Sequence, residues 1–247
     1  MLLPLAVLVA VIALWALLSA LRFYPESTFP SPLAVARAFQ QEISSKRLFD
    51  DLVASLFRVS AGFLLAVLVS VPLGLLLGHR MRARAALLPA VNFLRNLSPL
   101  AWIPFAILWF GIGDGPAIFL IFMASFTPIA LAITAAVASI PAVYFQVGRD
   151  YGLKGPQLLT RVTLPAIMPQ FITTLRVTAG VAWMVVVAAE MIAGRDGLGF
   201  AIWDSRNGLR IDLLVCEMIV TGLIGVTIDQ LLVRLTRLPN VRWGYER

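Results

Sequence analysis

Residues 146–169 read QVGRDYGLKGPQLLTRVTLPAIMP and form the longest polar segment in the second half of the chain. Long apolar runs flank this segment on both sides. Gly152 and Gly155 permit sharp backbone turns, and the pair Leu164-Pro165 stands near its end. The charged residues of the segment are Arg149, Asp150, Lys154 and Arg161. A polar, turn-rich loop between two apparent membrane spans predicts a docking surface for a partner on one side of a bilayer.

The composition of the whole chain is that of a helical membrane protein. Of its 247 residues, 60% are hydrophobic and only 13% are charged, and the mean hydropathy is +0.90. A soluble domain carries roughly 25% charged residues, and apolar runs of about 20 residues, the length that crosses a lipid bilayer, recur here. We therefore expect an all-α polytopic membrane protein. No internal repeat or separate soluble domain is apparent, so residues 1–247 are expected to form one transmembrane domain.

The charge and the rare residue types exclude several classes of site. The net charge of +7 does not indicate nucleic-acid binding, because the basic residues lie between the apolar runs instead of forming one patch. The single histidine, His79, excludes a histidine-cluster metal site. The single cysteine, Cys216, excludes an internal disulfide.

Six apolar segments are predicted to span the membrane. They cover residues 2–21, 52–78, 86–111, 116–138, 166–192 and 213–232. Residues 25–50 are expected to lie along the external surface, with a short amphipathic helix over 32–40. The glycine-rich segment 191–212 is expected to be external and to include a short re-entrant helix over 200–204.

Basic residues predict the orientation of the spans. The loops assigned to the inside carry eleven Lys and Arg residues, against eight in the segments assigned to the outside. Such an excess is typical of cytoplasmic loops. The densest group is Arg80, Arg82 and Arg84, next to His79, and a basic tail covers residues 234–247. The pattern favours about six spans with the N and C termini both cytoplasmic, and it places the loop at 146–169 inside the cell.

The third apolar segment contains a conspicuous break, PLAWIP at residues 99–104. Pro99 and Pro104 both remove backbone hydrogen bonds that lipid cannot replace, and such breaks are tolerated where protein or a water-filled cavity satisfies the freed carbonyl groups. Two interpretations stay open for Pro99, Trp102 and Pro104: a simple kink, or a segment that lines a pathway.

Four ionisable residues remain inside the predicted spans: Arg176, Glu190, Glu217 and Asp229. A charge at the bilayer centre costs at least about 2.5–3.5 kcal/mol, so each needs a partner, water or a position near a helix end. Arg176 and Asp229 lie toward the inner ends of their spans, where they either pair with each other or leave Arg176 to attract an anion. Glu190 and Glu217 lie toward the outer ends, and Glu190 either bonds backbone N–H groups of the glycine-rich turn or contacts a substrate.

Short motifs along nearly the whole chain match one known family. They read SLFRV at 55–59, AGF at 61–63, PLAWIP at 99–104, WFGIG at 109–113, LR at 175–176, AAEMIA at 188–193 and GLG at 197–199. In order and spacing the chain resembles the permease subunits of bacterial ABC importers, in the branch associated with nitrate, alkanesulfonates and taurine. The resemblance implies the type I importer fold in the bacterial inner membrane. It also favours a small oxyanion as the transported solute.

The resemblance also implies a role for the opening loop. It is similar to the coupling motif of the family, which begins Glu-Ala-Ala, continues with a glycine and ends with Leu-Pro. Gly152 and Leu164-Pro165 fit this motif, whereas Gln146-Val147-Gly148 replaces its acidic start. The resemblance then implies that the 146–165 loop, with Arg149 and Asp150, lies in a groove of an ATPase subunit and couples ATP-driven closure to rocking of the permease.

The partners expected from the resemblance are two ABC ATPase subunits, a second copy of the permease and an external substrate-binding protein. No cofactor is expected on this chain, and ATP and Mg²⁺ are expected on the ATPase subunits. The alternatives are a permease for a different small organic solute, an integral-membrane enzyme, and a passive channel or assembly factor. An enzyme would need clustered nucleophiles, bases or metal ligands in the membrane, which the isolated His79 and Cys216 do not supply.

Overall fold

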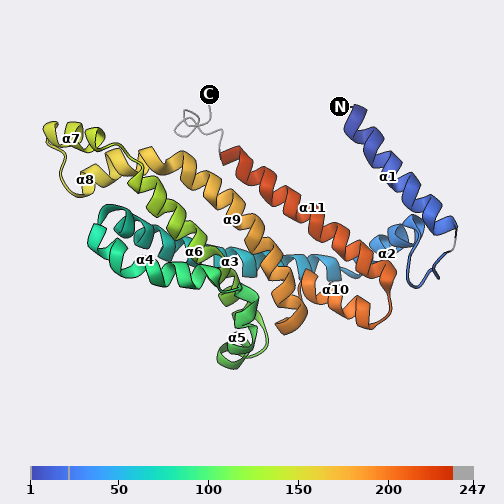
Figure 1. Ribbon diagram of the computed structural model, residues 1–247. Coiled ribbons are helices and arrows are strands. Elements are labelled where there is room, and N and C mark those ends of the chain that lie inside the picture. Colours follow the sequence, from blue (N-terminus) through green and yellow to red (C-terminus); the bar gives the residue numbers. More distant parts are fainter. Residues whose placement is uncertain (1, 22, 236–247) are drawn as a thin grey trace.

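The computed structural model describes residues 2–21 and 23–235, and every regular element in this part of the chain is a helix (Figure 1). The longer helices are α1 (Leu2–Ala20), α2 (Pro32–Ser45), α3 (Arg47–His79), α4 (Met81–Asn96), α6 (Asp114–Ala138), α9 (Leu164–Ala193) and α11 (Ile211–Leu235). The shorter ones are η1 (Pro99–Trp102), α5 (Ile103–Phe110), α7 (Ala142–Asp150), α8 (Pro156–Leu158), η2 (Leu159–Thr163) and α10 (Leu198–Asn207). The all-helical prediction is confirmed, and the predicted basic tail lies, from residue 236 on, outside the described residues.

Five stretches within the described residues are long and apolar enough to cross a membrane: α1, α3, α6, the run from α8 through α9, and α11. The predicted span at 86–111 is not one straight helix, because α4 and the η1–α5 unit meet at 88°. Proline supplies no N–H and its ring blocks the preceding turn, so Pro99 and Pro104 prevent a straight continuation. The bent pair supplies the sixth span if it crosses as a unit.

The centre of the fold is the packing of α3 against α6 and of α6 against α9. One face of α3 carries small residues that let the backbone of α6 approach closely. A Cβ atom at Gly62 would lie 2.7 Å from the carbonyl oxygen of Ile118, and one at Gly74 would lie 2.8 Å from that of Ala130. Between them, Ser70 donates a hydrogen bond of 2.8 Å to the carbonyl of Phe126. Small residues of this kind allow helices to associate in lipid, where no hydrophobic driving force acts between them.

The segment over residues 25–50, which is predicted to be external, is more helical than the sequence predicts. Ser31 Oγ accepts a hydrogen bond from the backbone N–H of Ala34 at 3.2 Å and caps α2. The helix then continues to Ser45, beyond the predicted end at residue 40, and α3 begins at Arg47 instead of residue 52. Lys46, with φ at 62°, is the single break between the two helices. The predicted helix at 200–204 corresponds to the longer α10.

The helices are arranged with two distinct ends (Figure 1). The α7–α8 unit, the start of α1 and the end of α11 lie toward the top of the view, whereas α5 and α10 lie toward the bottom. α1 stands apart from the core and exposes most of its apolar surface. Its contact with the rest of the protein includes a hydrogen bond of 3.1 Å from Trp15 Nε1 to the carbonyl of Pro30.

Candidate functional site

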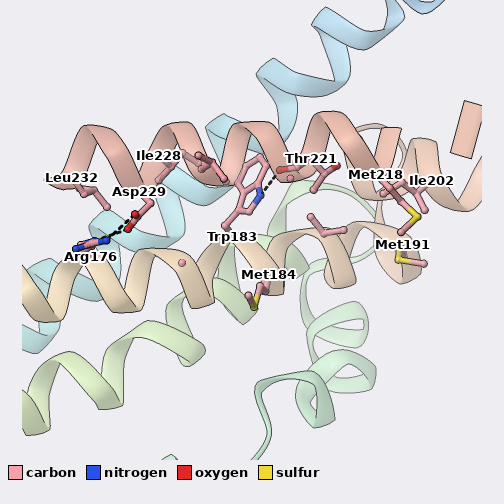
Figure 2. Close-up of a pocket in the computed structure, with 15 residues that line it drawn as sticks. Arg176, Trp183, Met184, Met191, Ile202, Met218, Thr221, Ile228, Asp229 and Leu232 are labelled. Carbon is pink, nitrogen blue, oxygen red and sulfur yellow. Dashed lines mark hydrogen bonds and ion pairs between the residues drawn. The ribbon is translucent and has the colours of Figure 1, made fainter. Parts of the chain in front are cut away.

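An open groove of about 890 Å³ runs along α9 and α11, with one contribution from α10 (Figure 2). Arg176 and Asp229 lie at one end of the groove, and Met191, Met218 and Ile202 gather at the other. Along α9, Arg176 and Met191 are 15 positions apart, which corresponds to roughly 22 Å at 1.5 Å per residue. The groove wall between these ends is almost entirely apolar. The groove is therefore a long, apolar surface with a single charged pair.

Arg176 and Asp229 form a bidentate ion pair that joins α9 to α11. Arg176 Nε lies 2.6 Å from Asp229 Oδ1, and Nη2 lies 2.9 Å from Oδ2. The pairing, one of the two alternatives that the sequence leaves open for Arg176, is thus present. Both side chains remain nearly half exposed, at 43% and 47%, so the guanidinium group still faces the groove while it holds the carboxylate.

The middle of the groove is shaped by Trp183. Its indole Nε1 donates a hydrogen bond of 3.1 Å to the carbonyl of Thr221 on α11. This bond is possible because Gly225 leaves room: a Cβ atom there would lie 3.1 Å from two atoms of the indole ring. The ring therefore spans α9 and α11 and forms part of the groove wall.

Glu190 lies in a buried polar network and does not line the groove. Both of its oxygens accept a hydrogen bond from Ser55 Oγ, at 2.9 and 2.8 Å, and Oε2 also accepts one from the backbone N–H of Gly199 at 3.0 Å. The predicted bond from the glycine-rich turn to Glu190 is therefore present. Arg58 Nη1 completes the set with a bond of 2.8 Å to Glu190 Oε1.

Arg58 is the centre of this network, and sequence reasoning assigned it no role. Its side chain is only 2% exposed. Besides Glu190, its guanidinium group contacts Asp114 Oδ1 at 2.6 Å, the carbonyl of Asp196 at 2.8 Å, and the Asp196 carboxylate. A detectable signal existed: Asp51, Ser55 and Arg58 recur at helical spacing and place three polar side chains on one face of α3.

Glu217 is also buried, at 1% exposure, and it too does not line the groove. Its Oε1 accepts a hydrogen bond of 3.0 Å from Ser205 Oγ on α10. Within the described residues, its Oε2 has no hydrogen-bond partner. The observed contact joins α11 to α10.

The broken segment forms a separate aromatic cluster. The ring of Trp102 lies 6.0 Å from Phe105, 6.4 Å from Trp109 and 6.2 Å from Phe119, measured between centroids. Neither Trp102 nor the two prolines beside it line the groove on α9 and α11. The structure does not bring this segment together with Arg176 and Asp229.

The 146–165 loop is built from two short helical arms. α7 ends at Asp150, and Gly152, with φ at 77°, reverses the chain toward α8. The arms touch where Gly148 faces Leu158, because a Cβ atom at Gly148 would lie 2.7 Å from the Leu158 side chain. Gly148 belongs to Gln146-Val147-Gly148, the residues that replace the acidic start of the family motif. The close packing of Leu158 explains why a glycine stands at position 148. Gln146, Arg149 and Asp150 are all exposed.

The exit of the loop is a π-helical turn. The backbone N–H of Leu164 bonds to the carbonyl of Leu159, five residues back. Pro165 has no N–H with which to continue the regular α-helical ladder, and its ring crowds the preceding turn. Leu164-Pro165 therefore widens the helix where the loop enters α9. Nearby, Thr163 Oγ1 lies 3.2 Å from His79 Nε2, which joins this turn to the end of α3.

Comparisons with known proteins agree with this geometry. Residues 70–240 match the family model described as binding-protein-dependent transport system inner membrane component. The chain belongs to this family. It is a permease subunit of the ABC importer type and a multi-pass protein of the inner membrane, and the resemblance seen in its motifs is confirmed.

Several relatives of the permease carry functional names. It is 38% identical to a putative ABC transporter permease protein of Methanocaldococcus jannaschii, over 78% of this chain and 72% of the relative. It is 34% identical to the nitrate import permease protein NrtB of Synechocystis sp., over 86% of this chain and 77% of NrtB. It is also 30% identical to a putative aliphatic sulfonates transport permease protein, SsuC, of Bacillus subtilis, over 94% of this chain and 84% of SsuC.

The fold of the permease is that of a solved importer. A chain of the MetNI methionine ABC transporter in an inward-facing conformation superposes with a TM-score of 0.68, over 77% of this chain and 94% of that chain, at 18% identity. The predicted type I permease fold is confirmed.

The structure divides the site residues of the permease into three groups. It brings Arg176 and Asp229 together in the groove, places Glu190 and Glu217 in contacts with α10, and keeps the 146–165 loop at the far end of α9.

Proposed function

We propose that the permease forms half of the translocation pathway of an ATP-driven importer and that α7 docks in a groove of an ATPase subunit. The observation that carries this proposal is an exposed apolar stripe on α7. Val143 and Val147 on α7, and Tyr151 directly after its end, recur every four residues and are 54%, 48% and 84% exposed. An amphipathic helix that offers such a face is suited to a hydrophobic groove on a partner. This stripe was not among the residues predicted from the sequence.

The mechanical contacts of the loop support a coupling role. Leu158 packs on Gly148 and fixes the two arms against each other, and the π-turn runs without interruption into α9. The bond between Thr163 and His79 adds a second route, into α3. A displacement of α7 by the ATPase would therefore reach two core helices through short, packed contacts.

The assembly that we propose contains two copies of this chain, two ATPase subunits that bind ATP and Mg²⁺, and an external binding protein. The apolar groove on α9 and α11 supports the pairing of two copies, because an open apolar surface of this size in a transporter subunit needs either lipid or a second protein face. Two grooves that face each other would enclose a pathway along α9. Both termini and the α7–α8 loop would lie in the cytoplasm.

The proposed solute is a small oxyanion such as nitrate, a sulfonate or taurine. The names of NrtB and SsuC support this class, and Arg176 is a cation that faces the groove. The apolar wall supports a second candidate, a small organic solute with an apolar body. The pair of Arg176 with Asp229 is nearly neutral, so we expect the external binding protein to carry out most of the selection.

Coupling is tested by placing a charge on the stripe. We expect Val147→Asp to abolish co-purification of the ATPase, because a carboxylate in an apolar groove loses its hydration. The matched control is Gln40→Asp, which adds the same charge to an exposed position on α2, at the other end of the protein. Normal ATPase recovery with Val147→Asp would refute docking through α7.

A second variant, Gly152→Pro, tests the turn between α7 and α8. Proline is incompatible with φ at 77°, so this variant should leave the permease folded and uncouple ATP hydrolysis from uptake.

The solute is tested by uptake into vesicles that contain the assembled transporter and its binding protein. Labelled nitrate, taurine and alkanesulfonates of increasing chain length are compared at equal concentration. Uptake of at least one anion supports the oxyanion class. Failure with every anion, while the ATPase remains assembled and active, would refute it.

A further inference from the structure

Four of the sequence motifs meet near the start of α10. Neither the proposed coupling role nor the proposed solute site uses this region. Ser55 and Arg58 come from SLFRV on α3, and Glu190 comes from AAEMIA on α9. Gly197 and Gly199 belong to GLG at the start of α10. WFGIG leads into the turn before Asp114, and the backbone N–H of Gly113 in this turn bonds to the carbonyl of Ala193 at 3.1 Å.

These contacts hold the start of α10 rigidly. Three successive backbone N–H groups are satisfied by α3 and α9: Gly197 donates to Asp51 Oδ1 at 2.7 Å, Leu198 to Ser55 Oγ at 2.9 Å, and Gly199 to Glu190 Oε2 at 3.0 Å. There is no free space around this start, because a Cβ atom at Gly197 would lie 2.5 Å from the Glu190 carboxylate. A small displacement of α10 would break all three bonds.

Arg58 makes the arrangement dependent on charge. The Glu190 carboxylate is buried, and a buried carboxylate is stable only when it is paired and hydrogen-bonded. Arg58 supplies the pair and also bonds both external turns, through Asp114 and Asp196. One guanidinium group thus joins the outer ends of α3, α6 and α9 to the turn that starts α10.

The other side of α10 faces the groove. Ile202 lies with Met191 and Met218 at the end of the groove farthest from Arg176 (Figure 2). This end also lies opposite the coupling loop, since the loop precedes α9 and α10 follows it. Ser205 bonds Glu217 on α11 and fixes the second half of α10 over the same end.

We propose that the Arg58–Glu190 network is a positioning clamp that holds α10 across the outer end of the groove, so that Ile202, Met191 and Met218 close the pathway to the outside. The proposal rests on the proposed transport function, since it assumes that the groove is part of the pathway. Opening to the outside then requires α10 to leave the clamp. Glu190 acts as a positioning residue and does not contact the solute.

The clamp is tested by thiol accessibility at the closure. Ile202→Cys is made in a Cys216→Ala background, and the permease is expressed with its ATPase in membrane vesicles whose external face is exposed. A membrane-impermeant maleimide measures the labelling rate. Ile202 is only 9% exposed, so slow labelling is expected. Adding Glu190→Gln, which removes the charge with little change of shape, is expected to raise the rate at least tenfold.

Matched variants distinguish release of the clamp from a general loss of packing in the protein. Trp203→Cys, on the same helix and 38% exposed, is expected to label quickly and at a rate that Glu190→Gln does not change. Ser55→Ala removes the hydroxyl oxygen that accepts the hydrogen bond from the backbone N–H of Leu198 at the start of α10. We expect it to give an intermediate labelling rate at Ile202→Cys. This variant provides the test if Glu190→Gln does not assemble. Arg58→Lys keeps the charge but lacks the planar guanidinium group that reaches several carboxylates. With Arg58→Lys, Ile202→Cys should therefore be labelled as fast as it is with Glu190→Gln.

The outcomes distinguish the clamp from the transport function. An Ile202→Cys rate that does not change in assembled Glu190→Gln and Ser55→Ala proteins would overturn the clamp. A rate that rises in both variants supports the clamp. The parent Ile202→Cys protein is also labelled with and without ATP and Mg²⁺: if ATP leaves its rate unchanged while both variants label faster, the clamp stands and ATP-driven transport through this groove is refuted.

Discussion

At the scale of single residues, the charges inside the spans differ in how much they depend on their partners. Arg58 and Glu190 are buried together, and the loss of either partner of such a pair typically costs about 3–5 kcal/mol. Arg176 and Asp229 are nearly half exposed, and an exposed ion pair contributes only about 0–1 kcal/mol. The first pair therefore contributes far more to stability than the second.

A charge swap decides between the two interpretations of Arg176. The double variant Arg176→Asp with Asp229→Arg keeps the ion pair and moves the cation from α9 to α11. If the pair only ties the helices together, the melting temperature should return to that of the parent and uptake to at least half of the parent rate, while either single variant lowers both. If Arg176 attracts the solute from its own position, the swap should restore the melting temperature but leave uptake at least tenfold reduced. Thermal unfolding and vesicle uptake measure the two effects.

At the scale of helices, small residues decide which pairs form the core. Gly62, Ser70 and Gly74 on α3 meet the backbone of α6, while Gly180 on α9 faces the groove and would meet nothing within 4 Å if a Cβ were added. The same residue type therefore has a packing role in one helix and leaves open space in the other.

We expect Gly74→Ala to destabilise the permease and Gly180→Ala to leave its stability nearly unchanged. The new Cβ at position 74 would lie 2.7 Å from Cβ of Ile133 and 2.8 Å from a backbone oxygen of α6, so the two helices must separate. Overpacking of this kind costs about 1–3 kcal/mol. Thermal unfolding in detergent compares both variants with the parent protein. Equal melting temperatures for Gly74→Ala and Gly180→Ala would contradict close packing of α3 on α6.

At the scale of the whole molecule, the proposed ATPase contact and the proposed clamp lie at opposite ends of the helix bundle. The α7–α8 loop lies at one end with the start of α1 and the end of α11, and the clamp on α10 lies at the other (Figure 1). α9 connects them over 30 residues, or roughly 45 Å at the rise of an α-helix. A single continuous helix thus joins the proposed ATPase contact to the proposed outer closure.

This arrangement predicts the sidedness of the protein in the membrane. Alkaline phosphatase fused after Gly208, in the turn between α10 and α11, should be active because it reaches the oxidising exterior. Fusions after Gly152 and after the last residue should be inactive, and green fluorescent protein at the same two sites should fluoresce. Enzyme activity of the C-terminal phosphatase fusion would contradict a cytoplasmic C terminus.

The sequence alone determined the class of the protein and much of its organisation. Apolar runs of membrane-spanning length and the low charge predict a helical membrane protein, because these features depend only on composition and length along the chain. Glycines and prolines at 99, 104, 152 and 165 mark breaks and turns for the same local reason. The sequence also allowed the pair of Arg176 with Asp229 to be considered, since a charge in a span needs a partner and both residues lie at similar depth.

Only the tertiary structure decided which residues act together. Arg58 looks in the sequence like a charge near a helix end, and its partners lie 56 to 138 positions away. The apolar stripe on α7 becomes informative only when its exposure is known, because the same spacing would serve as well for a buried face. The 88° bend between α4 and the η1–α5 unit and the place of Ile202 in the groove likewise follow from packing. Contacts between distant segments depend on how whole helices pack, and no local pattern encodes that choice.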